Sequence, residues 1–375
     1  MSLNELPVRD ATLLAIDEIN QQGGLLGRSV TPIVVDGRSD PAVFAREAQR
    51  LITVEGVSTI FGCWTSASRK SVKPVVEELN SLLFYPLQYE GLEESSNIVY
   101  TGAAPNQQII PAIKWAFDNL GQTFFLVGSD YVFPRTASAI IKDQVAALGG
   151  EIVGEEYILL GSQDVTAVVD HIVRARPAVL VNTINGDTNI AFFQQLRGAG
   201  ITPQRMPTMS FSIGESELTS LDAASMTGDY AAWNYFQSIE SPENAAFIQN
   251  FQQKYGGERV ISDPMEAAYF GVLLWAQAVR EAGSAEAADI RAAVGDQSRL
   301  APGGLVYIDR ATRHTWKFVR IGKIRPDGQF DIVWNSGVPV RPVPFPLYRH
   351  RSEWDEFLEG LYKEWGGQWT RPQTP

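Results

Sequence analysis

The sequence predicts an α/β protein in which parallel sheets are covered by helices on both faces. Continuous apolar segments of strand length alternate with amphipathic helical segments, which is typical of buried parallel strands joined by helices. The length of 375 residues suits two domains, each with its own core. The same rhythm starts again after about Phe117, so we expect two similar doubly wound halves.

The first half contains four predicted helices and four predicted strands. Apolar residues at helical spacing, with Gly23 and Gly24 as a stop, define the first helix. The helices are Asp10–Gln21, Pro41–Val54, a segment after Ser66, and Gln107–Leu120, and the strands are Val30–Val35, Val57–Phe61, Leu82–Tyr85 and Ile98–Tyr100.

The second half repeats this alternation and then changes character. Its strands are Phe124–Val127, Glu151–Leu159, Val179–Asn182, Pro207–Phe211 and Asp229–Phe236, and its helices are Thr136–Leu148, Val165–Ala175 and Asn189–Gly198. Two longer helices follow at Pro242–Tyr255 and Pro264–Ala282, then strands Trp316–Ile324 and Gln329–Trp334, an extended segment Arg341–Pro346 and a helix Glu353–Trp365. The late helices suggest that the chain crosses between the domains more than once.

Composition excludes several classes of partner. The formal net charge of −12 disfavours nucleic acid, because an acidic chain repels phosphate backbones. A single cysteine, Cys63, precludes an intrachain disulfide and is expected to pack as a small hydrophobe. No apolar run approaches membrane-spanning length, and no signal peptide is visible, so the chain as written would stay in the cytoplasm.

No pattern indicates an enzyme, a metal site or a cofactor. His171, His314 and His350 share no metal-ligand spacing and are expected to be surface or core residues. The sequence contains no phosphate-binding glycine loop, and no histidine near Cys63 could activate its thiol. No acidic pair stands out from the helix faces expected to be solvated.

Six segments together resemble the substrate-binding proteins of bacterial urea ABC importers and, more distantly, the amide sensor of an amidase operon. They are Gly62–Lys70 (GCWTSASRK), Leu83–Gly91 (LFYPLQYEG), Tyr100–Gln107 (YTGAAPNQ), Gly128–Arg135 (GSDYVFPR), Gly228–Trp233 (GDYAAW) and Ser262–Tyr269 (SDPMEAAY). The resemblance implies the type I periplasmic-binding-protein fold, with two doubly wound lobes, three hinge crossovers and a ligand cleft between the lobes. We expect lobe 1 in residues 1–117 and 243–314, lobe 2 in residues 118–242 and 315–350, and a tail with a short helix in residues 351–375.

In the first lobe, the candidate ligand residues follow two strands, at the sheet edge where open α/β proteins bind ligands. Ser66 could donate its hydroxyl to a ligand, or it could serve only as the N-cap of the helix that begins there. Gln88 offers both a donor and an acceptor, although it could be an ordinary turn residue. Trp64, Ala67, Tyr85 and Tyr89 complete this set, with the aromatic rings either walling the pocket or packing. Arg69 and Lys70 are expected on a solvated helix face.

In the second lobe, Tyr131 follows a strand and should reach the ligand by its position in the resembled family. Asn185 and Asp187 either contribute to the site or form a loop with N-cap chemistry. Phe211 and Ser212 end a further strand and are also candidates.

The start of the chain departs from the resembled family, whose members open with a strand in the middle of the first sheet. Residues Met1–Glu5 look like the loop that follows that strand. Without the strand, buried backbone groups of its neighbours would lack partners, at a cost of ~1–3 kcal/mol each. We therefore expect a truncated chain or a start codon assigned too late, with any export signal in the missing part.

The resemblance implies a receptor that closes around urea or a short-chain amide and delivers it to the permease of an ABC importer, outside the cytoplasm and without membrane insertion. Two alternatives remain at this point: a cytoplasmic sensory domain for the same ligands, and a branched-chain amino-acid binding protein. No acidic side chain precedes Glu90 in the first-lobe segments Trp64–Ala67 and Tyr85–Tyr89, which favours a small neutral ligand. Asp187 could reverse this preference if it reaches an amine.

Overall fold

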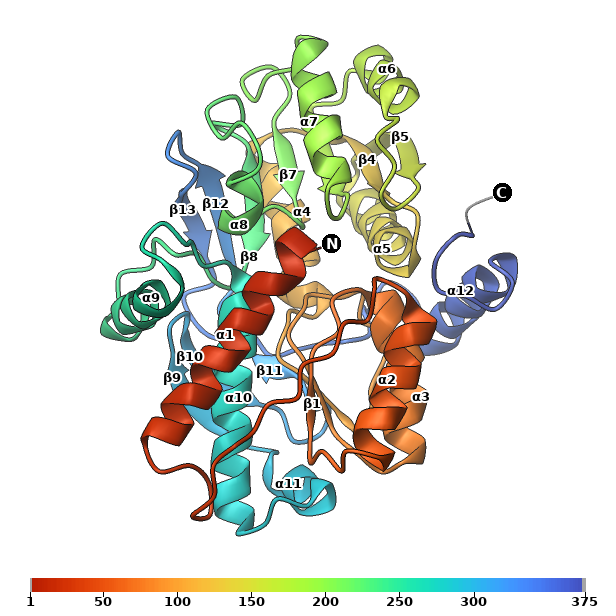
Figure 1. The fold of residues 1–375 in the computed structure, drawn as a ribbon. Helices are drawn as coiled ribbons and strands as arrows, with labels where there is room; N and C mark the ends of the chain where they lie inside the picture. Colours follow the sequence, from red (N-terminus) through yellow and green to blue (C-terminus); the bar gives the residue numbers. More distant parts are fainter. Residues whose placement is uncertain (1, 373–375) are drawn as a thin grey trace.

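The computed structural model describes residues 2–372 and arranges them in two lobes (Figure 1). The second lobe is built on a seven-stranded sheet, which lies in the upper part of Figure 1. Its spatial order is β13 (Phe330–Asn335), β12 (Arg320–Ile324), β8 (Tyr230–Trp233), β7 (Thr208–Ser210), β6 (Val179–Thr183), β4 (Thr123–Ser129) and β5 (Glu151–Ile158). The strands from β8 to β5 pair in parallel, and β12 and β13 add antiparallel at one edge.

Helices cover this sheet, and all but the first of them link its strands. They are α4 (Ile109–Asn119), α5 (Val132–Leu148), α6 (Thr166–Ala175), α7 (Thr188–Gly198) and the short α8 (Glu215–Leu218). Buried residues of α4 and α5 share one hydrophobic cluster with strands β4, β6 and β7, while α6 and α7 share another with β4 and β6. The predicted alternation of apolar strands and amphipathic helices is confirmed in this lobe.

The first lobe has a smaller parallel sheet of β1 (Ile60–Phe61), β2 (Leu83–Tyr85) and β3 (Ile98–Tyr100). Its helices are α1 (Ser2–Gln21), α2 (Pro41–Thr53), α3 (Ser66–Glu78), α9 (Pro242–Tyr255), α10 (Asp263–Ala282) and α11 (Ala287–Ala293). The late helix α10 packs along α1, so the chain does return to the first lobe. A separate antiparallel sheet joins β9 (Ser298–Ala301), β10 (Gly304–Ile308) and β11 (Thr315–Trp316).

Carboxamide side chains tie together the segments that cross between the lobes. Gln107, at the end of the 3₁₀ turn η1 (Pro105–Gln107), donates to the carbonyl groups of Thr315 at 2.9 Å and Val340 at 2.8 Å. Asn234 donates to the carbonyl groups of Gln107 at 2.9 Å and Phe318 at 2.8 Å. These bonds connect three crossovers and the segment after β13. The exact division into residues 1–117 with 243–314 and 118–242 with 315–350 stays a prediction.

The predicted strand Val30–Val35 is wrong: the segment belongs to no sheet. Asn20 instead bonds both backbone groups of Val30, at 2.7 and 2.8 Å. Ile33 is 43% and Val34 58% exposed, because no strand in the described part of the chain lies beside them. The start of the chain also differs from expectation, since α1 begins at Ser2 where a loop was expected, with Pro7 inside its first two turns.

The C-terminal segment runs over the outside of the molecule and includes α12 (Arg351–Glu364). Before the helix, the Arg349 guanidinium pairs with both carboxylate oxygens of Asp143 on α5, at 2.6 and 2.9 Å. Trp354, Leu358 and Leu361 of α12 are buried in the cluster that also holds α4 and α5. The helix is therefore attached to the second lobe.

Candidate functional site

The first-lobe part of the candidate site begins where β1 ends. Gly62 (φ 144°) and Cys63 (φ 64°) turn the chain, and Thr65 then caps α3 by accepting a hydrogen bond from the Ser68 backbone N–H at 3.1 Å. The interpretation of Ser66 as only an N-cap is therefore wrong, because Thr65 fills that role. Ser66 lies in the first turn of α3, 2% exposed, and donates its hydroxyl hydrogen to Glu90.

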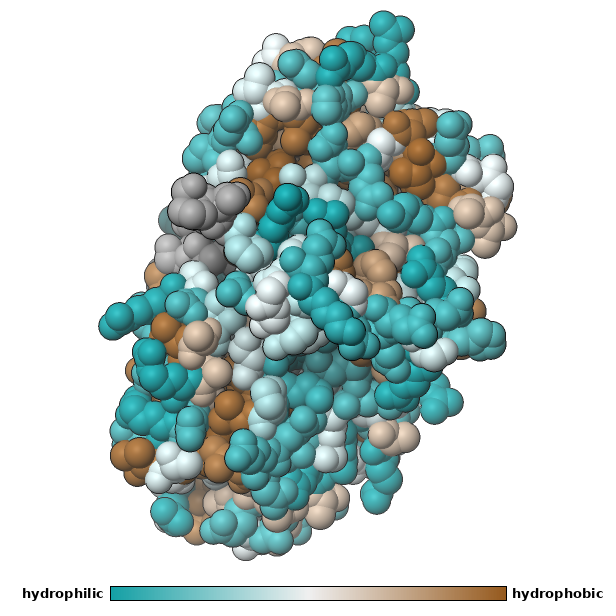
Figure 2. Space-filling model, turned by 90° about the vertical axis from the view of Figure 1, so that its right-hand side faces the viewer, coloured by the Kyte–Doolittle hydropathy of each residue, from teal (hydrophilic) through white to brown (hydrophobic). Residues whose placement is uncertain are grey.

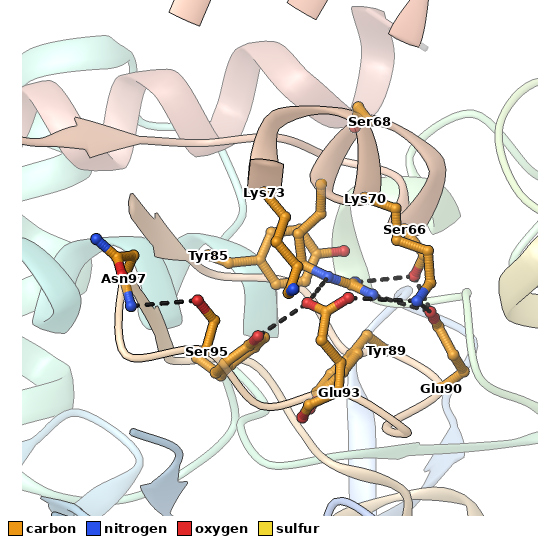
Figure 3. A network of polar contacts seen from close by, with 12 residues as sticks. Ser66, Ser68, Lys70, Lys73, Tyr85, Tyr89, Glu90, Glu93, Ser95 and Asn97 are labelled. Atoms are coloured by element: carbon orange, nitrogen blue, oxygen red, sulfur yellow. Dashed lines mark hydrogen bonds and ion pairs between the residues drawn. The ribbon is translucent and has the colours of Figure 1, made fainter. Parts of the chain in front are cut away.

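A buried network of charges lies behind Ser66 (Figure 3). The Arg69 guanidinium bonds Ser66 Oγ at 3.1 Å, Glu90 Oε1 at 2.9 Å and Glu93 Oε1 at 3.0 Å. Lys70 Nζ lies 3.2 Å from Glu93 Oε2, and the Tyr100 hydroxyl donates to Glu93 Oε1 at 2.8 Å. Burial alone would raise the pKa of Glu93, but Arg69 and Lys70 hold it far below its ordinary value.

This arrangement corrects the expectation that Arg69 and Lys70 lie on a solvated helix face. Arg69 is fully buried and Lys70 is 9% exposed. A buried cation needs a partner, and the loop between β2 and β3 supplies two carboxylates, Glu90 and Glu93. The two cations and two carboxylates balance each other.

Aromatic rings enclose the guanidinium group. Arg69 Cζ lies 4.8 Å from the ring centroid of Tyr85 and 4.5 Å from that of Tyr89. The Tyr85 hydroxyl donates to the carbonyl oxygen of Trp64 at 3.1 Å. Tyr89 contacts His314, whose ring stacks on Tyr100 at 4.1 Å, and burial lowers the pKa of His314 to about 4. Tyr85 and Tyr89 thus support the charge network, and His314 is a core residue, one of the two outcomes expected for it.

The second-lobe part of the candidate site lies at the ends of β4 and β6. Tyr131 follows β4 as the N-cap residue of α5 and is 3% exposed. The Asn185 side chain, just after β6, donates to the Tyr131 hydroxyl at 3.0 Å, and the Asn185 backbone N–H bonds Ser129 Oγ at 3.0 Å. The parallel sheet therefore brings these two predicted residues together.

The remaining second-lobe candidates behave differently. Ser212 Oγ donates to the carbonyl oxygen of Ile184 at 2.5 Å, so its hydroxyl hydrogen already has a partner. Asp187 is exposed at the N-terminus of α7, and its side chain caps no backbone group there. Phe211 is fully buried, and its backbone carbonyl oxygen accepts a hydrogen bond from the Gln88 side chain.

Gln88 joins the two lobes. Its side-chain nitrogen donates to the carbonyl oxygen of Phe211 at 3.0 Å, across the interface between the lobes. Gln88 is 7% exposed, and its side-chain oxygen Oε1 is buried without a hydrogen-bond partner. An unpaired buried acceptor at a lobe interface is a natural place for a ligand N–H group.

Residues from both lobes are close enough to act on each other electrostatically. Burial raises the pKa of Tyr131, and Tyr85 and Glu90 of the first lobe raise it further. Ser66, Gln88, Tyr131 and Asn185 are each at most 7% exposed. The candidate residues of both lobes are thus buried in this structure. Among residues 2–372, with masked side chains set aside, no cluster of His, Cys, Asp and Glu fits a metal ion.

Comparison with known proteins identifies the class. Residues 1–351 match the family model described as periplasmic binding protein domain, and the chain belongs to this family of solute-binding proteins. Leu/Ile/Val-binding protein homolog 6 of Brucella melitensis is 25% identical over 285 residues, which cover 74% of this chain and 72% of that protein. A limonene hydroxylase of Geobacillus stearothermophilus is 35% identical over 117 residues, but this chain covers only 21% of that protein's length.

Solved structures share the fold. A solute-binding protein of an ABC transporter from R. palustris, in complex with 4-hydroxybenzoate, superposes with a TM-score of 0.80 at 24% identity, covering 89% of this chain and 94% of that one. The substrate-binding protein LivJ of Streptococcus pneumoniae, in complex with isoleucine, gives a TM-score of 0.77 at 20% identity, covering 90% and 94%. The fold is therefore that of type I periplasmic binding proteins, as predicted. In the part of the chain that the structure describes, no helix combines the length and apolarity that crossing a bilayer requires.

Proposed function

We propose that this solute-binding protein closes around a small uncharged molecule that carries N–H donors, urea or a short-chain amide, and delivers it to the permease of an ABC importer. The observation that carries the proposal is the side-chain oxygen of Gln88, a buried acceptor without a partner between the lobes. A ligand amide N–H would satisfy it. The site residues Trp64, Ser66, Ala67, Tyr85, Tyr89, Tyr131, Asn185, Asp187, Phe211 and Ser212 remain part of this proposal.

The charge balance of the site supports an uncharged ligand. Arg69 and Lys70 are already paired with Glu90 and Glu93, so no buried charge in this network is left to neutralise a ligand ammonium or carboxylate. Introducing an unpaired charge into such surroundings is costly. The N-terminus of α3 adds backbone N–H groups that suit a carbonyl oxygen.

A second candidate is a ligand with a carboxylate, either a branched-chain amino acid or an aromatic acid. The name of the Brucella relative and the isoleucine bound in one similar structure favour an amino acid, and the 4-hydroxybenzoate bound in the other favours an aromatic acid. Arg69 could receive a carboxylate only if Glu90 gave up its bond to the guanidinium group. Exposed Asp187 could meet an amine.

Isothermal titration calorimetry distinguishes the candidates. We expect heat of binding with urea, acetamide or formamide, and none with leucine, valine or 4-hydroxybenzoate. Ser66→Ala and Tyr131→Ala should each weaken binding by ~1–3 kcal/mol, because each removes a buried hydrogen-bonding group. Ser29→Ala, at an exposed position in the loop after α1, is the matched control and should bind like the wild type. Tight leucine binding without any response to urea or amides would reject the proposal.

A further inference from the structure

The segment after α12 contacts both lobes beside the candidate site. On the second lobe it forms a short antiparallel bridge, in which the Val132 N–H donates to the Trp369 carbonyl at 3.0 Å and the Arg371 N–H donates to the Asp130 carbonyl at 3.1 Å. The Arg371 side chain also pairs with Asp130 Oδ2 at 3.1 Å. These bonds flank Tyr131, the candidate ligand residue of this lobe.

On the first lobe the same segment contacts the charge network. Lys70 Nζ lies 4.7 Å from the ring centroid of Trp369, within the range of a cation–π interaction. Lys70 bonds Glu93, Glu93 bonds Arg69, and Arg69 bonds Ser66, so the contacts continue to the candidate ligand residue of this lobe. Figure 3 shows Lys70 beside Glu93, with Ser66 and Glu90 nearby.

The two attachments differ in kind. Helix α12 buries Trp354, Leu358 and Leu361 in a cluster made mostly by the second lobe, with Ala67 and Leu92 of the first lobe at its edge, and backbone hydrogen bonds to Asp130 and Val132 tie the following segment to the second lobe. Toward α3 of the first lobe, a cavity of about 320 Å³ remains between the tail and charged side chains that include Lys73 and Glu77. The surface on this side of the molecule is mostly hydrophilic (Figure 2). The tail contacts charged residues of the first lobe through Trp369 beside Lys70 and through Arg351, which lies 3.6 Å from Glu94, and both contacts would be lost if the lobes part.

From these contacts we infer that Trp369, Thr370 and Arg371 form a positioning segment for the ligand site, which fixes the backbone around Tyr131 and stabilises the closed arrangement through Lys70. The segment lies beyond the residues that match the family model, which end at 351. A contact made only in the closed form shifts the equilibrium toward closure. The inference rests on the proposed function only in taking this cleft as the ligand site.

The test uses full-length variants that weaken each attachment. Trp369→Ala removes the ring beside Lys70. Arg371→Pro removes both the backbone donor and the guanidinium group opposite Asp130. Trp369→Phe and Arg371→Lys are the conservative partners that should restore function, and Arg325→Ala, which breaks the exposed pair with Asp327 on the β12–β13 turn, is the control.

Two measurements are made on each variant whose melting temperature stays near that of the wild type. Small-angle scattering without ligand should show a larger radius of gyration for Trp369→Ala and Arg371→Pro. Stopped-flow measurement with urea as the probe should show about tenfold faster dissociation, the factor that corresponds to losing one modest contact. The conservative variants and Arg325→Ala should match the wild type in both.

Unchanged radius of gyration and unchanged dissociation in both Trp369→Ala and Arg371→Pro would overturn the inference. The scattering measurement needs no ligand, so it tests the segment even if urea fails to bind the wild type. In that case the proposed ligand is wrong, and the radius of gyration of the ligand-free variants alone decides whether the positioning segment holds the lobes together. Because Arg371 is largely exposed, Arg371→Pro keeps the test available if Trp369→Ala does not fold.

Discussion

Glu215 is a carboxyl group that its surroundings keep protonated near neutral pH. It is 1% exposed at the start of α8, and burial raises its pKa to about 8, although the Gln237 N–H donates to it at 2.7 Å. Its second oxygen has no partner. In the unfolded chain the same group titrates near its ordinary value of about 4.5. Folding stability therefore depends on pH through this residue.

The sign of that dependence follows from the raised pKa. The contribution of Glu215 to stability is fully present below about pH 4.5 and is lost as the pH rises toward 8, because only the unfolded state then ionises freely. Glu215→Gln should remove this loss. Its free energy of unfolding relative to the wild type should rise by roughly 2–4 kcal/mol between pH 4.5 and 8. Guanidinium denaturation across this range measures it, with exposed Glu240→Gln as control. Parallel pH profiles for Glu215→Gln and the wild type would contradict the assignment.

The loop between β2 and β3 is the element that connects the candidate site to the C-terminal segment. It carries Gln88, Glu90 and Glu93, and its Leu92 N–H donates to the Pro344 carbonyl at 2.8 Å. Gly91 has φ +71°, and a Cβ atom there would lie 2.1 Å from the same carbonyl oxygen. The loop can hold this course only with glycine at position 91.

Gly91→Ala should therefore displace either the loop or the segment at Pro344. We expect a destabilisation of roughly 1–3 kcal/mol, together with weaker ligand binding because Gln88 and Glu90 shift with the loop. Thermal unfolding and calorimetry measure the two effects. Gly360→Ala on α12, where a Cβ atom meets nothing within 4 Å, is the matched glycine control. If Gly91→Ala has wild-type stability and binding, the loop accommodates a Cβ atom at position 91 and the expected clash with the Pro344 carbonyl is wrong.

Elements with strong local signals were predictable, whereas pairings between distant elements were not. The bounds of α9 and β3 agree with the sequence pattern because caps and apolar runs mark them locally. Val30–Val35 has the composition of a strand but no neighbour to pair with, and composition alone cannot supply one. The helix α11 and strands β9 and β10 were missed because they are short and partly exposed.

The candidate site shows the same limit. Position after a strand, together with the family resemblance, selected Ser66, Gln88, Tyr131 and Asn185. In the structure Asn185 bonds Tyr131, and Gln88 reaches the second lobe at Phe211. The pairing of Arg69 with Glu90 and Glu93 spans 21 to 24 residues and depends on how the β2–β3 loop folds over α3. The adjacent basic residues and the two acids three positions apart were a signal, but they resemble an ordinary solvated surface in the sequence.

At the scale of the whole molecule, the two lobes should separate and close. Ser66 and Gln88 lie on one lobe and Tyr131 and Asn185 on the other, so a ligand that contacts both favours the closed form. Small-angle scattering should show the radius of gyration fall as a binding solute is added to saturation. A non-binding solute at the same concentration is the control. An unchanged profile at saturation would count against a hinged receptor.

Cys63 offers a single site at which a fluorescent probe could be attached to follow this motion. It is the only cysteine in the chain, it directly precedes Trp64 at the turn between β1 and α3, and burial raises the pKa of its thiol to about 12. The side chain is partly exposed, and a thiol this hard to ionise reacts slowly. A fluorescent maleimide would consequently attach at one defined place beside the candidate ligand residues, where a change in its emission on adding a solute would report binding. The same chemistry would turn the protein into a reagent for measuring its own ligand.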